Sequence, residues 1–173
     1  DHLFLGDYVV TAANTDMPSG LVFVIFSTVS RSNVNDGGAV TLAVARFDEN
    51  GSRIGDWRDL MTFTVLPGWR IDSESLEAVV GNNQIAVAFC LPFGTNVPRR
   101  SQAFFFRTDF QGNLIKKIVK LKLPNSGNNH YAKVFPPLWN GTRWLVPAET
   151  ETIRQYPNFG FVKNQVLVFA STD

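Results

Sequence analysis

The sequence has few of the residues on which disulfides, metal sites and much acid–base catalysis depend. Its 173 residues include one cysteine and two histidines. A lone cysteine excludes an intrachain disulfide, and with His2 and His130 it is too few for a zinc site of the usual Cys/His kind. Cys90 lies in the apolar run IAVAFCLP, which favours a small buried side chain over a nucleophile. We therefore expect no metal or other cofactor.

The sequence also lacks an excess of charge of either sign and lacks long apolar runs. Sixteen Lys and Arg residues against fifteen Asp and Glu residues give a formal net charge of +1. Nucleic acids and anionic membranes favour concentrated basic patches, so we expect neither as a partner. The longest apolar runs are well short of a membrane span, so we expect no membrane insertion. Hydrophobic residues nevertheless form 45% of the chain, enough for a sizeable core.

The apolar runs that are present are typical of β-strands. They are short, rich in β-branched and aromatic residues, and bounded by Gly, Asn, Pro and Asp. The clearest runs cover 21–27, 39–47, 84–90, 102–108, 143–148 and 165–171. The best helical candidate, ESLEAVV at 74–80, is short and runs directly into Gly81-Asn82-Asn83, so we interpret it as a strand. The sequence therefore predicts an all-β fold.

One turn occurs twice in closely similar form. RFDENGSRI at 46–54 recurs as RTDFQGNLI at 107–115, with Arg, Asp, Gly and Ile at the same offsets. In each copy a strongly apolar strand enters Asp-x-x-Gly and a more polar strand leaves. Glycine adopts positive φ without steric cost, and an aspartate side chain can accept hydrogen bonds from the N–H groups just ahead of it. Both segments are therefore predicted to be tight hairpin turns.

Extending outward from these turns gives repeated units of about 60 residues. A full unit has four strands and closes with a polar outer strand, as in a β-propeller blade. We predict a partial β-propeller over 1–173, with blades at about 7–64, 74–123 and 132–173, the last without its outer strand. Three blades do not close a ring, which predicts a fragment or one of several assembling chains. The alternative fold is a β-sandwich in which the repeated turn is a coincidence.

Two segments resemble blades of secreted bacterial β-propellers: VARFDENGSRIG at 44–55 and LWNGTRWLV at 138–146. Those repeats commonly pair an aromatic-Asn-Gly turn before the second strand with an R-x-D-x-x-G-x-x-I turn after the third. The resemblance covers most of the chain and implies a secreted or periplasmic protein, but it implies no particular activity. The chain departs from the family in its long and dissimilar loops between second and third strands.

The long loops are where we expect function, because loops carry function while strands hold them in place. In a blade, the loops between second and third strands share one face with the connections to the next blade, and the Asp-x-x-Gly turns lie on the opposite face. Arginine and aromatic residues, which suit binding surfaces, are frequent in these loops. The predicted binding residues are Arg31, Trp69, Arg70, Arg99, Arg100, His130, Tyr131, Arg154 and Tyr156. A single exposed arginine is commonly just solvated, so the hypothesis concerns the face as a whole.

We expect a non-catalytic binding or assembly module rather than an enzyme. Its partner would be a protein or further copies that complete the ring, with carbohydrate as an alternative ligand. One alternative is a carbohydrate-active hydrolase, for which Asp36, Asp72, Glu74, Glu149 and Glu151 are the available loop acids. A glycosidase needs two carboxylates a few ångströms apart, and the sequence places no such pair. Another alternative is a purely structural fragment completed by another chain.

Two remaining patterns have structural explanations. Asn50 and Asn140 fit the N-glycosylation pattern, but both lie in Asn-Gly turns that hairpin geometry already requires, so glycosylation stays open. The strand NLIKKIVKLKL at 113–123 carries four lysines. Lysines on an outer strand discourage pairing between sheets of different molecules, so they need no nucleic acid to explain them.

Overall fold

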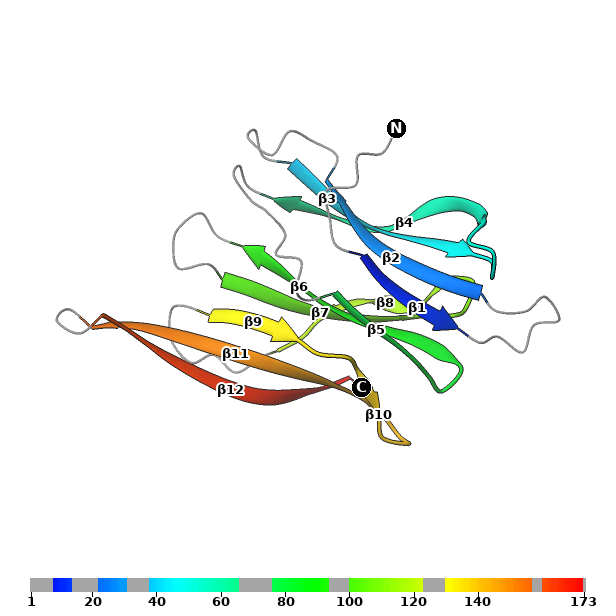
Figure 1. The fold of residues 1–173 in the computed structure, drawn as a ribbon. Helices are drawn as coiled ribbons and strands as arrows, with labels where there is room; N and C mark the ends of the chain where they lie inside the picture. The colour runs from blue at the N-terminus through cyan, green and yellow to red at the C-terminus, as the bar shows by residue number, and fades with distance from the viewer. Residues whose placement is uncertain are drawn as a thin grey trace.

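The computed structural model describes residues 8–13, 22–30, 38–65, 76–93, 100–122, 130–156 and 160–172. These residues contain β-strands and no helix, which confirms the predicted all-β class (Figure 1). The strands are β1 (Tyr8–Ala13), β2 (Val22–Ser30), β3 (Gly38–Phe47), β4 (Arg53–Val65), β5 (Leu76–Gly81), β6 (Gln84–Phe93), β7 (Arg100–Thr108), β8 (Leu114–Lys120), β9 (His130–Val134), β10 (Leu138–Trp139), β11 (Trp144–Tyr156) and β12 (Gly160–Thr172).

The described strands form three antiparallel sheets. Sheet A has the order β1-β2-β3-β4, and sheet B has the order β5-β6-β7-β8. In sheet C, β12 pairs with the whole length of β11, while β10 and β9 pair with successive parts of its other edge. Strands β9 and β10 therefore act as one interrupted strand. The predicted strand at 74–80 is confirmed from Leu76 onward, where it forms β5.

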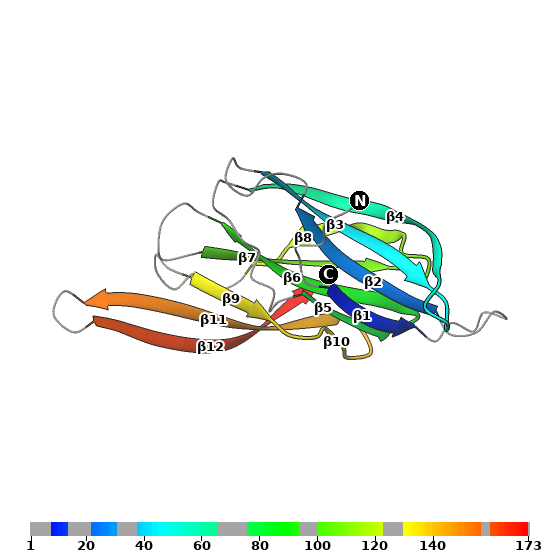
Figure 2. The same ribbon diagram turned by 45° about the horizontal axis from the view of Figure 1, so that its top comes forward.

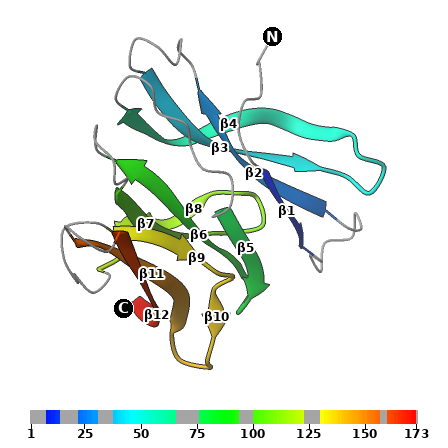
Figure 3. The same ribbon diagram turned by 60° about the vertical axis from the view of Figure 1, so that its left-hand side comes forward.

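The three sheets are stacked, with sheet B between sheets A and C (Figures 1 and 3). Alternate side chains of a strand point to opposite faces, and β6 is buried on both. Ile85, Val87 and Phe89 belong to a core cluster shared with sheet A. The intervening residues Ala86, Ala88 and Cys90 belong to a second cluster shared with sheet C. This double burial explains the continuous apolar run in β6, and a two-sheet sandwich does not describe the arrangement.

The two cores differ in the size of their side chains. Between sheets A and B, large aromatics meet: Phe89 stacks on Phe104 with ring centroids 5.2 Å apart, and Phe63 of sheet A contacts both. Between sheets B and C, alanines of β6 and β7 face the larger Trp144, which is 2% exposed. Cys90 is buried in this second core, as its apolar context predicts.

The repeated Asp-x-x-Gly segments form the same hairpin turn, as predicted. Asp48 Oδ1 accepts hydrogen bonds from the backbone N–H groups of Asn50 and Ser52, at 2.9 and 2.8 Å. In the second copy, Asp109 Oδ1 accepts from the N–H of Asn113 at 2.7 Å. The glycine of each turn has a φ of 78°, a conformation that L side chains rarely adopt. Local sequence chemistry thus fixes the connections from β3 to β4 and from β7 to β8.

Candidate functional site

Four of the predicted binding residues, Arg31, Trp69, Arg70 and Arg99, lie outside the described residues. The loop acids Asp36, Asp72 and Glu74 of the hydrolase alternative also lie outside them. For these positions the binding face remains a prediction from sequence.

The other five predicted binding residues lie on strands near sheet ends. Arg100 opens β7, opposite Phe93. His130 and Tyr131 open β9, and Arg154 and Tyr156 are close to the end of β11. The beginnings of β7 and β9 and the end of β11 lie at one end of the stack, on the left of Figures 1 and 2, whereas the β3–β4 and β7–β8 turns lie at the opposite end. The backbone thus brings these five positions to the same end of the molecule.

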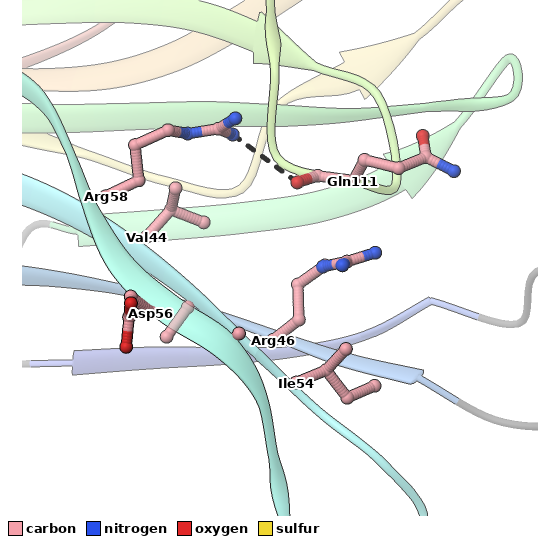
Figure 4. Close-up of a pocket in the computed structure, with 8 residues that line it drawn as sticks. Val44, Arg46, Ile54, Asp56, Arg58 and Gln111 are labelled. Carbon is pink, nitrogen blue, oxygen red and sulfur yellow. Dashed lines mark hydrogen bonds between the residues drawn. The ribbon is translucent and has the colours of Figure 1, made fainter.

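A pocket of about 180 Å³ lies at the opposite end, between the β3–β4 hairpin of sheet A and the β7–β8 turn of sheet B (Figure 4). We call it the hairpin pocket. Two cationic, one anionic and one amide side chain line it, together with apolar residues. Its lining residues are Val44, Ala45, Arg46, Ile54, Gly55, Asp56, Arg58 and Gln111.

An irregularity in the pairing of β3 with β4 lies at the hairpin pocket. Val44 pairs with Arg58 and Arg46 pairs with Ile54, so three residues of β4 lie opposite the single residue Ala45. A β-bulge of this kind bends the strand and redirects its side chains. Gly55, the first of the three, has a φ of 79°, which favours glycine at this point of the bulge.

Arg58 of β4 forms hydrogen bonds to the β7–β8 turn of sheet B. Its Nη1 donates a hydrogen bond to Oδ1 of Asn113 at 2.6 Å, and its Nη2 donates to the carbonyl oxygen of Gln111 at 3.3 Å. Asn113 Nδ2 in turn donates to Oδ2 of Asp109 at 2.7 Å. Gly112 sits so close that an added Cβ would lie 3.1 Å from both Arg58 Nη2 and Val44 Cγ2. One arginine therefore connects the two sheets through the repeated turn.

Arg46 lies on the same face of sheet A as Arg58 but does not share its hydrogen bonds to the β7–β8 turn. Arg46 follows Val44 by two residues and pairs with Val24, and both valines belong to the core against sheet B. Its side chain is partly exposed, and within the described part of the chain it makes no hydrogen bond or ion pair. The acid in the lining, Asp56, is 98% exposed and lies 3.6 Å from Nη2 of Arg53. The hairpin pocket therefore carries cationic character beyond what its own carboxylate balances.

The groups that line the hairpin pocket suit binding better than acid–base chemistry. The hairpin pocket has a single carboxylate, whereas glycoside hydrolysis requires two that act together. Burial raises the pKa of Glu77 on β5 above its ordinary value of 4.5, and the positive charge of Lys133 opposes this shift. Glu77 is not part of the pocket lining. Within the described ranges, no group of three or more His, Cys, Asp or Glu residues could hold a metal ion.

No sequence pattern marks Arg46, Arg58 or Gln111 as binding residues. Arg46 and Gln111 belong to the repeated turn, which the predicted blade places on the face away from the expected ligand. A usable signal was present in β4, where Gly55 interrupts an otherwise strand-like segment and indicates a bulge. The hydrogen bond from Arg58 to Asn113 joins two sheets, so a local sequence pattern does not predict it.

The described residues contain no helix that is long and apolar enough to span a membrane. Comparison with known proteins gives no family assignment: no family model, curated protein or solved structure matches this chain.

Proposed function

We propose that the chain is an arc of a β-propeller that acts as a non-catalytic binding or assembly module. The observation that carries this proposal is the repetition of one sheet along a stack. Sheets A and B are four-stranded antiparallel meanders that use the same turn between their third and fourth strands. Their first strands, β1 and β5, contact each other, and β5 in turn contacts β10, which together with β9 forms the interrupted first strand of sheet C. Neighbouring first strands are what blades around a common axis require.

The repeated arginine supports the same arrangement. Arg46 of sheet A lies on the face toward sheet B, because it alternates with Val44 in the shared core. Arg107 of sheet B alternates with Phe105, which belongs to the core shared with sheet C. The repeated arginine therefore lies on the face toward the next sheet in both copies, as corresponding residues of propeller blades do.

The unpaired edge of β12 supports an assembly role. Strand β12 corresponds to β3 and β7, each of which pairs with a fourth strand. Among the described residues, β12 pairs only with β11. It contributes 13 residues with a register free of shifts and a single lysine, so its edge lacks the bulges and clustered charges that protect open edges. We propose that further strands, from additional copies or a protein partner, complete the ring.

Ligand recognition would use the end of the stack at which β7 and β9 begin. Arg100, His130, Tyr131, Arg154 and Tyr156 come to this end, and Arg and Tyr are enriched at protein interfaces. The resemblance of 44–55 and 138–146 to secreted propellers further suggests a secreted or periplasmic location. Glu77 gives little support to a hydrolase, because the charge that acts on it comes from a lysine rather than a second carboxylate.

The native mass of the chain tests the proposal. We expect light scattering coupled to size exclusion to give a mass well above the 19.3 kDa of one chain, and to fall toward that value on dilution. A monodisperse monomer that stays folded at all concentrations would refute the assembly role, because the open edge of sheet C would then be stable without a partner.

A further inference from the structure

The hairpin pocket places two arginines of sheet A next to the turn of sheet B. Arg46 and Arg58 share the face of sheet A that carries the core residue Val44. Arg58 is held by Asn113 and by the carbonyl of Gln111, so its guanidinium is fixed at one wall of the pocket. In Figure 4 the side chains of Arg46 and Gln111 extend in the same direction. A guanidinium and a side-chain amide are thus available as hydrogen-bond donors beside a second, fixed positive charge.

The repeat supplies an internal comparison for Arg46. Its counterpart in sheet B, Arg107, donates a hydrogen bond to Oε1 of Gln84 at 3.1 Å. Gln84 precedes the pairing partner of Arg107 by two residues, and Val22 takes that position relative to Arg46. Valine offers no acceptor, so sheet A has no counterpart of the Gln84 acceptor at this position. The second cation is also particular to sheet A, because Val119 stands in sheet B where Arg58 stands in sheet A.

We propose that the hairpin pocket binds a carboxylate, whose oxygens accept hydrogen bonds from the Arg46 guanidinium and the Gln111 amide. The planar fork of arginine matches a carboxylate, and the fixed charge of Arg58 adds electrostatic attraction. The volume of about 180 Å³ is below the range of roughly 300–1,000 Å³ typical of drug-sized ligands. The ligand is therefore a small organic acid or the acidic side chain of a polypeptide. Asp56 in the lining repels a multiply charged anion such as phosphate more strongly than a singly charged carboxylate.

Titration of the full 173-residue chain with sodium acetate, followed by amide NMR at constant ionic strength, tests this site. We expect saturable shifts at Arg46, Gly55 and Gln111, with the amides of β12 unaffected. Arg46→Gln should weaken acetate binding by about tenfold, as expected for the loss of one charged hydrogen-bonding pair. Arg107→Gln is the matched control, because it removes the equivalent arginine from the neighbouring sheet and should leave acetate affinity unchanged.

Other outcomes would overturn the proposal. These are shifts that grow linearly without saturation, equal weakening by Arg46→Gln and Arg107→Gln, or tighter binding of inorganic phosphate than of acetate. Because Arg46 is partly exposed, its variant should fold, and a dispersed spectrum verifies this. A parallel titration with N-acetyl-glutamate amide separates the two sources. Tighter binding than acetate indicates an acidic side chain of a polypeptide, and weaker binding indicates a free acid.

The site lies at the end of the stack away from the proposed binding face. Its test measures amide chemical shifts around one pocket and does not depend on ring closure. The carboxylate site and the assembly role can therefore fail independently.

Discussion

Gly81 stands where the end of β5 meets the indole ring of Trp144, at the junction of sheets B and C. A Cβ added at Gly81 would lie 2.8 Å from Cη2 of Trp144, a distance that requires one of the two groups to move. Trp144 is buried in the second core among alanines, so its ring has little room to shift. The absence of a side chain at Gly81 therefore allows a large ring to fill the space between two sheets.

Gly81→Ala should destabilise the protein by about 1–3 kcal/mol, the usual cost of overpacking a close-packed interior. Urea unfolding monitored by circular dichroism measures this change. Trp144→Phe removes the ring atom that the new methyl group would strike. In the Trp144→Phe background the same glycine substitution should cost less, whereas an equal cost in both backgrounds would assign the effect to the backbone rather than to the contact.

At the scale of elements, the two hairpin turns share their local chemistry but differ in their tertiary contacts. Asp48 accepts backbone hydrogen bonds within its own turn. Asp109 does so as well, and its Oδ2 also accepts a hydrogen bond from Nδ2 of Asn113. The side-chain oxygen of Asn113 accepts a hydrogen bond from Arg58. The second turn therefore connects two sheets, while the corresponding bonds of the first are confined to one hairpin.

Asp109→Ala should lower the free energy of unfolding by about 1 kcal/mol more than Asp48→Ala, because it also loosens the amide that Arg58 binds. A double-mutant cycle with Arg58→Gln, read by urea unfolding, isolates this term. We expect Asp109 and Arg58 to be coupled, whereas Asp48 and Arg58 should be additive. Additivity in both cycles would show that the hydrogen bonds from Arg58 to the turn do not depend on Asp109.

How far the sequence predicts each element depends on whether the deciding contacts are local. The strands and the Asp-x-x-Gly turns follow from apolar runs and from hydrogen bonds that span at most four residues, so they are predictable. The bulge at Gly55 and the contact from Arg58 to Asn113 depend on how two sheets meet. For that reason the hairpin pocket was not predicted, even though Arg46 and Gln111 belong to the recognised repeat.

At the scale of the whole molecule, the position of each sheet in the stack determines how well its amides are protected from hydrogen exchange. Sheet B is covered on both faces, and residues Ile85 to Cys90 of β6 are all buried. Opening β6 requires both cores to separate, so its amides should report the largest opening free energies in the chain. Hydrogen exchange therefore offers a measure of the stack that is independent of any single side chain.

The same measurement decides whether a fourth strand covers β12. Strands β3 and β7 pair on both edges, while β4 and β8 pair on one, so sheets A and B each contain a reference for protection. If further strands complete the ring, amides of β12 should exchange as slowly as those of β7, because both edges would then be hydrogen-bonded. In hydrogen–deuterium exchange at high protein concentration we expect this slow exchange, with acceleration toward the β8 rate on dilution. Exchange of β12 at the β8 rate under all conditions would mean that its edge stays open in solution, and the arc would then have no partner at that edge.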